Sequence, residues 1–270
     1  MATQPREEMI SVGGIKVHTL IGGHGDPVLV LHGAGGSLGW RRWLDRLAEN
    51  FTVYAPSHPG YDRSDSADWM ESVRDIARFY LWFLDVVGQD RVHVIGSSMG
   101  GWTAAELAVM NPHVVNRLVL VDPVGLKPEQ GEILDIFFLS PEEVFAKAYY
   151  NAEQAPEYAE LYGQPPTAEQ RDIQMRNREM AARITWKPYM HNPRLPHFLP
   201  RVTVPTLIVW GREDEIVPLE CGEQYQRLLP NATLRVIDQC GHSPQIEKPD
   251  EFLSLVTEFL GVASPAGAKQ

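Results

Sequence analysis

The sequence has few features that would place the protein in a membrane or on nucleic acid. No apolar run approaches the roughly 20 residues that a transmembrane helix needs, and the start of the chain lacks the basic and apolar regions of a signal peptide. The 24 basic residues are outnumbered by 35 acidic ones, giving a net charge of −11. Such a surface repels phosphate backbones and anionic lipids. We therefore expect a cytoplasmic protein with neither nucleic acid nor a membrane as partner.

Cysteine is also scarce. The chain has only Cys221 and Cys240, and neither lies in a C-x-x-C or zinc-binding spacing. Without a signal peptide, we expect both to be reduced thiols. The sequence has no H-E-x-x-H motif and no cluster of histidines and cysteines. We therefore predict that the protein has no metal site.

Hydrophobic residues, by contrast, make up 44% of the 270 residues, enough for a sizeable core. Short apolar runs at 28–31, 51–55, 92–95 and 117–121 alternate with stretches that have helical spacing. Strands that alternate with helices predict a mostly parallel sheet covered on both faces. Before them, residues 8–21 alternate around a Gly-Gly pair and predict a β-hairpin at the edge of that sheet.

The pattern changes after Pro123. Residues 124–199 contain no convincing strand and have helical spacing interrupted by prolines. Strand and helix patterns resume near residue 200 and continue to Leu260. We therefore predict an α/β core formed by residues 1–123 and 200–270, with a helical cap inserted at 124–199.

The stretch Val92–Gly101 carries the strongest functional signal. A β-branched run leads into Gly96-Ser97-Ser98-Met99-Gly100, which is followed by an Ala-rich helical pattern. A G-x-S-x-G sequence between a strand and a helix is typical of a nucleophile elbow, in which the central serine lies on a strained turn. The two glycines are expected where a side chain would collide with the neighbouring strand or helix. Ser98 is therefore the predicted nucleophile.

A serine hydroxyl needs a base, and that base needs an orienting acid. Of the nine histidines, His242 follows the last predicted strand in a loop at the carboxyl edge of the sheet, where sites form in α/β proteins. Asp214 follows the preceding strand and is the favoured acid, with Asp122, after an earlier strand, as the rival. The predicted catalytic triad is Ser98, Asp214 and His242.

The reaction also needs two backbone N–H groups to hold an oxyanion. One is expected from Met99, directly after the nucleophile. The other is expected from the glycine-rich loop after residues 28–31, where Ala34 is favoured over Gly35. His32 opens the same loop, and we expect it to brace the loop.

Together these motifs closely resemble the α/β-hydrolase superfamily, over roughly residues 8–260. The order Ser98, Asp214, His242 is the nucleophile–acid–base order of that family, and the resemblance implies that the insertion is a cap domain. The serine nucleophile argues against dehalogenase and epoxide hydrolase activity. The sequence departs from the family in one loop: members of this kind usually carry glycine at the position of Asp62 and often an acidic residue at that of Ser57.

The favoured function is hydrolysis of carboxylic esters, including lactones, through an acyl-enzyme and without a cofactor. The expected partner is a small ester or lactone with an apolar acyl group, and the expected state is a monomer or homodimer. The side chains proposed for the acyl pocket are apolar residues of the cap: Phe137, Phe138, Phe145, Tyr149, Tyr150, Met175, Met180 and Trp186.

Two alternatives stay open at this stage. One is hydrolysis of a C–C bond in a vinylogous diketone acid, for which Arg183 and Arg194 are the candidate partners of the substrate carboxylate. The other is a ligand receptor that keeps the fold and the triad but turns over slowly. A kinetic assay would distinguish a receptor from an enzyme.

Overall fold

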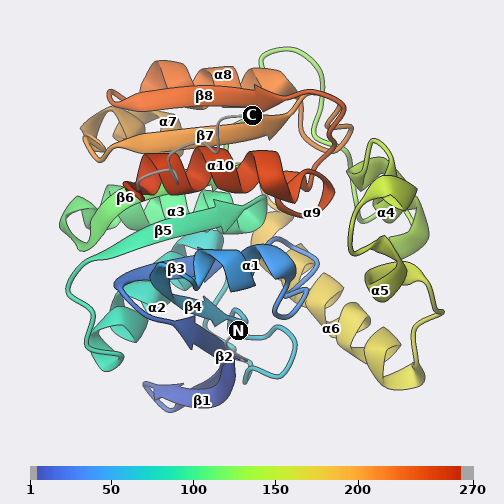
Figure 1. The fold of residues 1–270 in the computed structure, drawn as a ribbon, viewed down its shortest axis with the longest axis horizontal. Coiled ribbons are helices and arrows are strands. Elements are labelled where there is room, and N and C mark those ends of the chain that lie inside the picture. Colours follow the sequence, from blue (N-terminus) through green and yellow to red (C-terminus); the bar gives the residue numbers. More distant parts are fainter. Residues whose placement is uncertain (1–4, 263–270) are drawn as a thin grey trace, which may run out of the picture.

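A single eight-stranded sheet organises the protein, in the strand order β1-β2-β4-β3-β5-β6-β7-β8 (Figure 1). The computed structural model describes residues 5–262, so the outer ends of the two predicted core ranges, 1–4 and 263–270, lie outside the described residues. Strand β2 runs antiparallel to β1 and β4, and every other neighbouring pair is parallel. The predicted α/β-hydrolase fold and its edge hairpin are therefore confirmed.

The strands are β1 (Arg6–Val12), β2 (Ile15–Gly23), β3 (Asp26–Leu31), β4 (Phe51–Pro56), β5 (Val92–Ser97), β6 (Val115–Val121), β7 (Thr206–Gly211) and β8 (Ala232–Ile237). The α-helices are α1 (Arg42–Leu47), α2 (Val73–Val86), α3 (Met99–Met110), α4 (Pro141–Ala148), α5 (Tyr158–Tyr162), α6 (Ala168–Thr185), α7 (Leu195–Phe198), α8 (Leu219–Leu228), α9 (Pro244–Glu247) and α10 (Pro249–Leu260). Short 3₁₀ turns lie at Pro112–Val114, Ala152–Gln154 and Leu199–Arg201.

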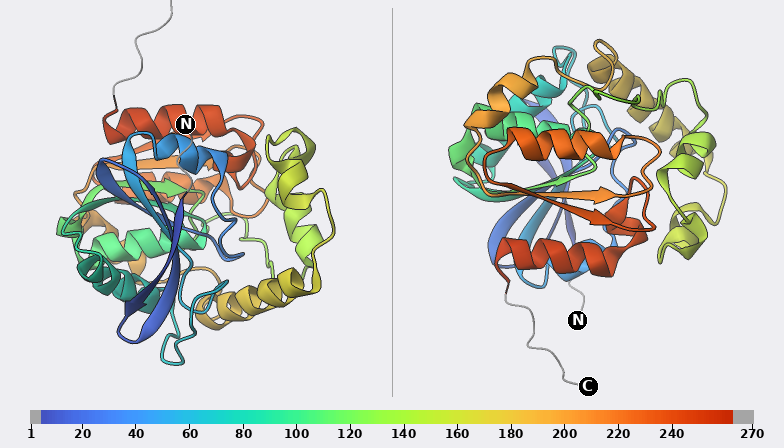
Figure 2. Two further views of the ribbon diagram at one scale, coloured as in Figure 1. Left: turned by 60° about the horizontal axis from the view of Figure 1, so that its bottom comes forward. Right: turned by 90° about the horizontal axis from the view of Figure 1, so that it is seen from above.

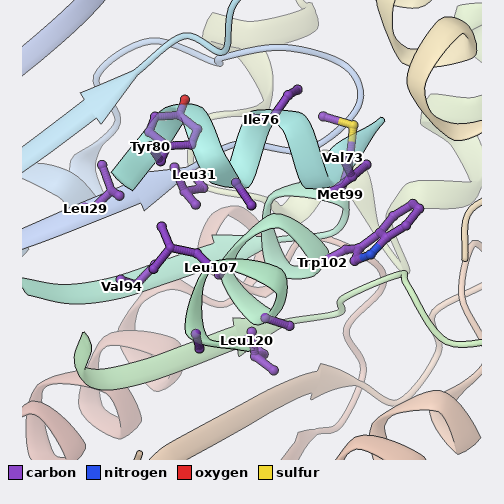
Figure 3. Packing of buried hydrophobic residues seen from close by; sticks show 14 of the residues in the cluster. Leu29, Leu31, Val73, Ile76, Tyr80, Val94, Met99, Trp102, Leu107 and Leu120 are labelled. Carbon is purple, nitrogen blue, oxygen red and sulfur yellow. The ribbon is translucent and has the colours of Figure 1, made fainter. Parts of the chain in front are cut away.

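The helices cover both faces of the sheet because its central strands are apolar on both sides. Helices α2, α3 and α8 pack on one face, while α1 and α10 pack together on the other. Figure 2 shows α8 and α10 on opposite sides of the strands. In Figure 3, Tyr80 of α2 lies beside Leu29 and Leu31 of β3, and Leu107 of α3 lies beside Val94 of β5. Each layer therefore has its own apolar cluster.

The strand order creates a crevice at one edge of the sheet. From β3 the chain passes through α1 to β4 on one side, and from β4 through α2 to β5 on the other side of β3. The connections on the two sides of β3 thus lie on opposite faces, and the loops that follow β3 and β5 diverge. Ligands bind at such switch points, outside the carboxyl ends of the strands. The loops that carry the predicted site residues start at this edge.

Between β6 and β7 the described chain forms helices α4 to α7 and no strand. Helices α4, α5 and α6 lie beside the carboxyl edge of the sheet, whereas α7 lies at the opposite end of the strands (Figure 1). Local sequence sets where two of them begin: Ser140 with Glu143 and Thr167 with Gln170 form reciprocal capping boxes at the starts of α4 and α6. No helix among residues 5–262 is long and apolar enough to cross a membrane.

Candidate active site

Ser98 lies on a strained turn between β5 and α3. Its φ of 54° and ψ of −118° are unfavourable for any residue with a side chain. The turn is tight because the helix packs directly on the strands: a Cβ on Gly96 would lie 2.2 Å from the Gly100 carbonyl oxygen, and one on Gly100 would lie 2.2 Å from that of Leu31. Only glycine fits at these two positions, and the serine hydroxyl is held at the carboxyl edge of the sheet.

His242 and Asp214 form a direct pair. The Nδ1 of His242 lies 2.7 Å from Oδ2 of Asp214, whose side chain is 1% exposed. The other carboxylate oxygen of Asp214 accepts the backbone N–H groups of Ile216 at 2.7 Å and Val217 at 3.0 Å. Both oxygens are therefore oriented by hydrogen bonds, and the carboxylate fixes the imidazole with Nε2 free to face a substrate.

Asp122, the rival acid, lies behind this pair. It is fully buried, and its Oδ1 accepts the Gly211 N–H at 2.9 Å, while its Oδ2 has no hydrogen-bond partner in residues 5–262. Burial raises the pKa of Asp122 well above its ordinary value, and the charge of Asp214 raises that pKa further. A protonated Asp122 can donate to Asp214, which supplies the partner that Oδ2 otherwise lacks. The structure thus brings the imidazole to Asp214.

Asp122, Asp214 and His242 also offer oxygen and nitrogen atoms that all lie within 4.8 Å of one another, a spacing that a metal ion could use. The bond between His242 and Asp214, with Asp122 packed behind them, accounts for this proximity without an ion. Only one of the two carboxylates is expected to be charged, because the pKa of Asp122 is raised. A buried, neutral carboxylic acid is a poor cation ligand.

The loop after β3 faces Ser98. A Cβ built on Gly33 would lie 3.2 Å from the Cβ of Ser98, so the loop backbone approaches the nucleophile closely. The Gly36 N–H donates to the Gly33 carbonyl at 3.2 Å and closes a turn around Ala34. Among the described residues, no oxygen accepts the Ala34 N–H. This donor is available for an oxyanion, as is expected of Met99 at the start of α3.

His32 braces the start of this loop, as its place in the sequence suggested. Its Nδ1 donates to the Gly33 carbonyl at 2.8 Å, and its Nε2 accepts the backbone N–H of His58 at 2.9 Å. His58 in turn donates from Nε2 to the His32 carbonyl at 2.9 Å and accepts the Tyr80 hydroxyl at Nδ1, 2.6 Å away. Both rings are neutral in this arrangement. Burial lowers the pKa of each, that of His58 well below the usual range.

A cavity of about 400 Å³ lies between the sheet edge and the helices that follow β6. Ser98, His242 and Ala34 line it, so the predicted nucleophile, base and oxyanion donor share one cavity. A cavity of this size accommodates a small organic molecule. Most of its wall is apolar, and three of the eight proposed pocket residues contribute: Phe137, Phe145 and Tyr149.

The other five proposed pocket residues lie elsewhere. Phe138, Tyr150, Met175 and Trp186 are more than half exposed, and Met180 is buried in the core against Gly60. Helical periodicity shows which residues share a face but not which face meets the core, so these were assigned wrongly. Other residues that line the cavity were not predicted from the sequence, among them Trp43, Ile136, Val144, Tyr162 and Gln245.

Two cationic side chains line the cavity, Arg41 and Arg178. Arg178 donates to the carbonyls of Phe137 at 2.9 Å and Leu139 at 2.8 Å. Nη1 of Arg41 lies 3.7 Å from a carboxylate oxygen of Glu157 and 3.8 Å from one of Glu160, while its Nε is buried and has no partner among the described residues. The candidates from the sequence lie outside the cavity wall: Arg183 is exposed and donates to the Asp68 carbonyl, and Arg194 is exposed. The expectation for those two residues was wrong, because both side chains are exposed to solvent.

Comparison with known proteins places the chain in a family. A family model described as the alpha/beta hydrolase fold matches residues 26–249. The chain therefore belongs to the α/β-hydrolase fold family, and it is a hydrolase. A 2-hydroxy-6-oxononadienedioate/2-hydroxy-6-oxononatrienedioate hydrolase of Pseudomonas sp. is 31% identical over 91% of this chain and 92% of its own.

Solved structures agree with this placement. The 2-hydroxy-6-oxo-6-phenylhexa-2,4-dienoate hydrolase of Rhodococcus sp. strain RHA1 superposes with a TM-score of 0.80 at 26% identity, covering 96% of this chain and 99% of its own. A bacterial membrane phospholipase A also has a TM-score of 0.80 at 26% identity, covering 95% and 86%. The fold alone thus accommodates different substrates.

The favoured prediction of ester or lactone hydrolysis is wrong. Several relatives that span nearly the whole chain are named as hydrolases of hydroxy-oxo-dienoates, and one as a 2-hydroxymuconate semialdehyde hydrolase. These names correspond to the alternative prediction of a C–C bond hydrolase. The reason for the error is chemical. A serine triad and an oxyanion hole attack a ketone carbonyl with the same geometry as an ester carbonyl, so the motifs do not distinguish the two substrates.

Proposed function

We propose that the protein hydrolyses the C–C bond beside the ketone of a 2-hydroxy-6-oxo-dienoate. The observation that carries this proposal is the near full-length similarity to hydrolases named for that substrate class, at 30–31% identity. The catalytic residues are Ser98, Asp214 and His242, with the N–H groups of Ala34 and Met99 as the oxyanion hole. No cofactor takes part in this scheme.

The first half of the reaction makes an acyl-enzyme. The substrate first becomes its keto tautomer, in which the 2-hydroxyl proton has moved to C5. Ser98 Oγ then adds to the C6 carbonyl and passes its proton to Nε2 of His242. Asp214 holds Nδ1 of the imidazolium at 2.7 Å. The oxyanion at C6 receives hydrogen bonds from Ala34 and Met99.

Collapse of this intermediate breaks the C5–C6 bond. The electron pair moves into the conjugated chain and ends on the C2 oxygen, which takes the proton from His242. A 2-hydroxydienoate leaves, and the remaining acyl group stays on Ser98. Water, deprotonated by His242, then releases that group as a carboxylic acid. The whole reaction consumes one water molecule. C5 can leave as a carbanion because conjugation delocalises its electron pair onto the C2 oxygen.

We further propose that residues 124–199 form the cap that closes over this substrate. The cap supplies Phe145, Tyr149 and Tyr162, whose rings lie 3.8–6.1 Å apart and make an apolar wall for the acyl group. Arg41 and Arg178 are the candidate partners for the substrate carboxylate, because they are the arginines in the cavity wall.

The test is turnover of 2-hydroxy-6-oxo-6-phenylhexa-2,4-dienoate by the purified protein. We expect loss of the dienolate absorbance with release of benzoate and a 2-hydroxydienoate, at about 1 s⁻¹ or faster. Ser98→Ala should lower kcat at least about ten-thousandfold because the nucleophile is lost. The exposed Ser254→Ala on α10 is the matched control and should retain wild-type activity.

Tight binding with turnover below about one per minute would instead indicate the slow receptor. Wild-type protein that neither cleaves the dienoate nor releases benzoate would refute the proposal. So would a Ser98→Ala variant whose activity is within tenfold of wild type after contaminating hydrolases are excluded.

A further inference from the structure

Asp62 lies where proteins resembling this one usually carry glycine, and its backbone keeps the conformation that glycine favours, with φ at 50°. Aspartate tolerates this left-handed region better than most residues, at some cost. Its side chain makes use of the position: Oδ2 accepts the backbone N–H of Ser37 at 3.0 Å. Ser37 belongs to the loop after β3 that carries Ala34. Asp62 therefore ties two loops together at the edge of the active site.

Asn177 of α6 completes the contact from the side of the cap. It is 3% exposed. Its Nδ2 donates to Oδ1 of Asp62 at 2.8 Å and to the Gly35 carbonyl at 3.0 Å, while its Oδ1 accepts the Asp62 N–H at 2.8 Å. The opposite amide orientation would put donor against donor at the Asp62 N–H, so this network sets the orientation.

Asp62 and Asn177 bond to the two neighbours of Gly36 in the loop after β3, Ser37 and Gly35. Gly36 has a φ of +98°, and a Cβ there would lie 2.1 Å from Nδ2 of Asn177 and 2.7 Å from Oδ1 of Asp62. The two side chains thus occupy the space beside the loop and bond its residues 35 and 37. On its other flank, the loop is held by His32. A loop rich in glycine has little rigidity of its own, so its position depends on these attachments.

We propose that Asp62 and Asn177 are positioning residues that hold the Ala34 N–H in place for the oxyanion and make α6 and this loop move as one unit. The inference rests on the proposed serine nucleophile and oxyanion hole, and not on which substrate the enzyme takes. A pre-placed oxyanion donor contributes to the rate only while its position is maintained, because small misplacements are costly.

Exchange of amide and carboxylate tests the pairing directly. In Asn177→Asp, an oxygen replaces the donor that faces both Asp62 and the Gly35 carbonyl, so two bonds become repulsions. In the swapped double variant Asp62→Asn with Asn177→Asp, the new amide at 62 can donate to the carboxylate at 177 and still accept the Ser37 N–H. Only the bond to Gly35 stays lost, so the double variant should recover function.

The measurement is the second-order rate of Ser98 phosphonylation by an uncharged fluorophosphonate, followed by intact mass. This rate is a property of each folded site and does not depend on the dienoate, so failure of the substrate proposal leaves it interpretable. We expect Asn177→Asp to react about ten- to hundredfold more slowly, and the swapped variant to come within about fivefold of wild type. The exposed Asp172→Asn on the same helix should react at the wild-type rate.

Asn177→Asp reacting within twofold of wild type would overturn the proposal, as would a swapped variant that recovers nothing. Lower thermal stability with an unchanged rate would show a merely structural contact and would also overturn it. If Asn177→Asp fails to fold, the phosphonylation rate of Asp62→Gly tests the proposal instead. Glycine suits the φ at that position, so the variant should be stable yet react several-fold more slowly; a wild-type rate there would likewise refute the inference.

Discussion

At the scale of single residues, the site depends on which of two buried carboxylates meets the imidazole. Asp122 and Asp214 follow adjacent parallel strands, β6 and β7, and both reach the carboxyl edge of the sheet. Two backbone N–H groups turn Asp214 toward His242. Asp122 is held inward by the Gly211 N–H. The backbone donors thus assign different roles to two chemically identical side chains.

This division predicts unequal effects of the same substitution. Asp214→Asn should lower kcat on the order of ten-thousandfold, because an amide would hold the imidazole in the wrong tautomer. Asp122→Asn should cost less than about tenfold, because burial and the charge of Asp214 already raise the pKa of Asp122 and so favour its neutral form, which the amide resembles. Steady-state kinetics of both variants on the dienoate provide the measurement. Reversed effects would mean that Asp122 is the catalytic acid.

At the scale of elements, the approach of α3 to the ends of β3 and β5 creates the elbow. The strands and the helix come so close that backbone meets backbone at Gly96 and Gly100. The helix starts directly at the strained serine, with no capping side chain at Ser98. The first N–H groups of α3 are thereby left for the reacting oxyanion, which the positive end of the helix also favours.

We expect Gly100→Ala to destabilise the fold by about 3 kcal/mol or more, because its Cβ would lie 2.2 Å from the Leu31 carbonyl and 2.5 Å from that of His32. Gly35→Ala is the control. A Cβ on Gly35 would have no atom within 4 Å, and the φ of this residue is not left-handed. The free energy of unfolding of this variant should therefore differ from that of the wild type by less than about 0.5 kcal/mol. Urea unfolding of the two variants measures the difference. Equal midpoints would contradict the packing argument.

At the scale of the whole molecule, the acidic surface bears on the proposed substrate. The chain carries a net charge of −11, while a dienoate carries at least one negative charge and a dienedioate two. Like charges slow diffusional encounter, and salt screens this repulsion over about 10 Å at 0.1 M. The encounter rate should therefore depend on both the ionic strength and the charge of the substrate.

We predict that kcat/KM rises with ionic strength, by roughly two- to fivefold between 20 and 200 mM NaCl. The rise should be steeper for 2-hydroxy-6-oxononadienedioate than for the phenyl dienoate, because the former bears two carboxylates. The control is the uncharged fluorophosphonate, whose reaction with Ser98 should not depend on salt. A fall in kcat/KM with salt would instead show that a local positive field, such as that of Arg41 and Arg178, dominates the encounter.

The sequence by itself determined the parallel sheet, the edge hairpin and the elbow at Ser98. These depend on local periodicity and on glycines whose neighbours in the chain already dictate a strand–turn–helix unit. The sequence also predicted Asp214 as the acid and His242 as the base, because residues that follow parallel strands converge on one edge of the sheet. The triad could therefore be proposed before any contact was known.

Only the tertiary structure decided which cap residues face the cavity, because a helix shows its faces in sequence but not what each face meets. It likewise brought Arg41 and Arg178 into the cavity wall. The tertiary structure also shows what Asp62, an unusual residue at its position in the sequence, contacts. Its partners Ser37 and Asn177 lie 25 and 115 positions away. Bonds between segments so distant in the chain leave no local pattern, because the first forms only when two loops of the core meet and the second only when α6 packs against them.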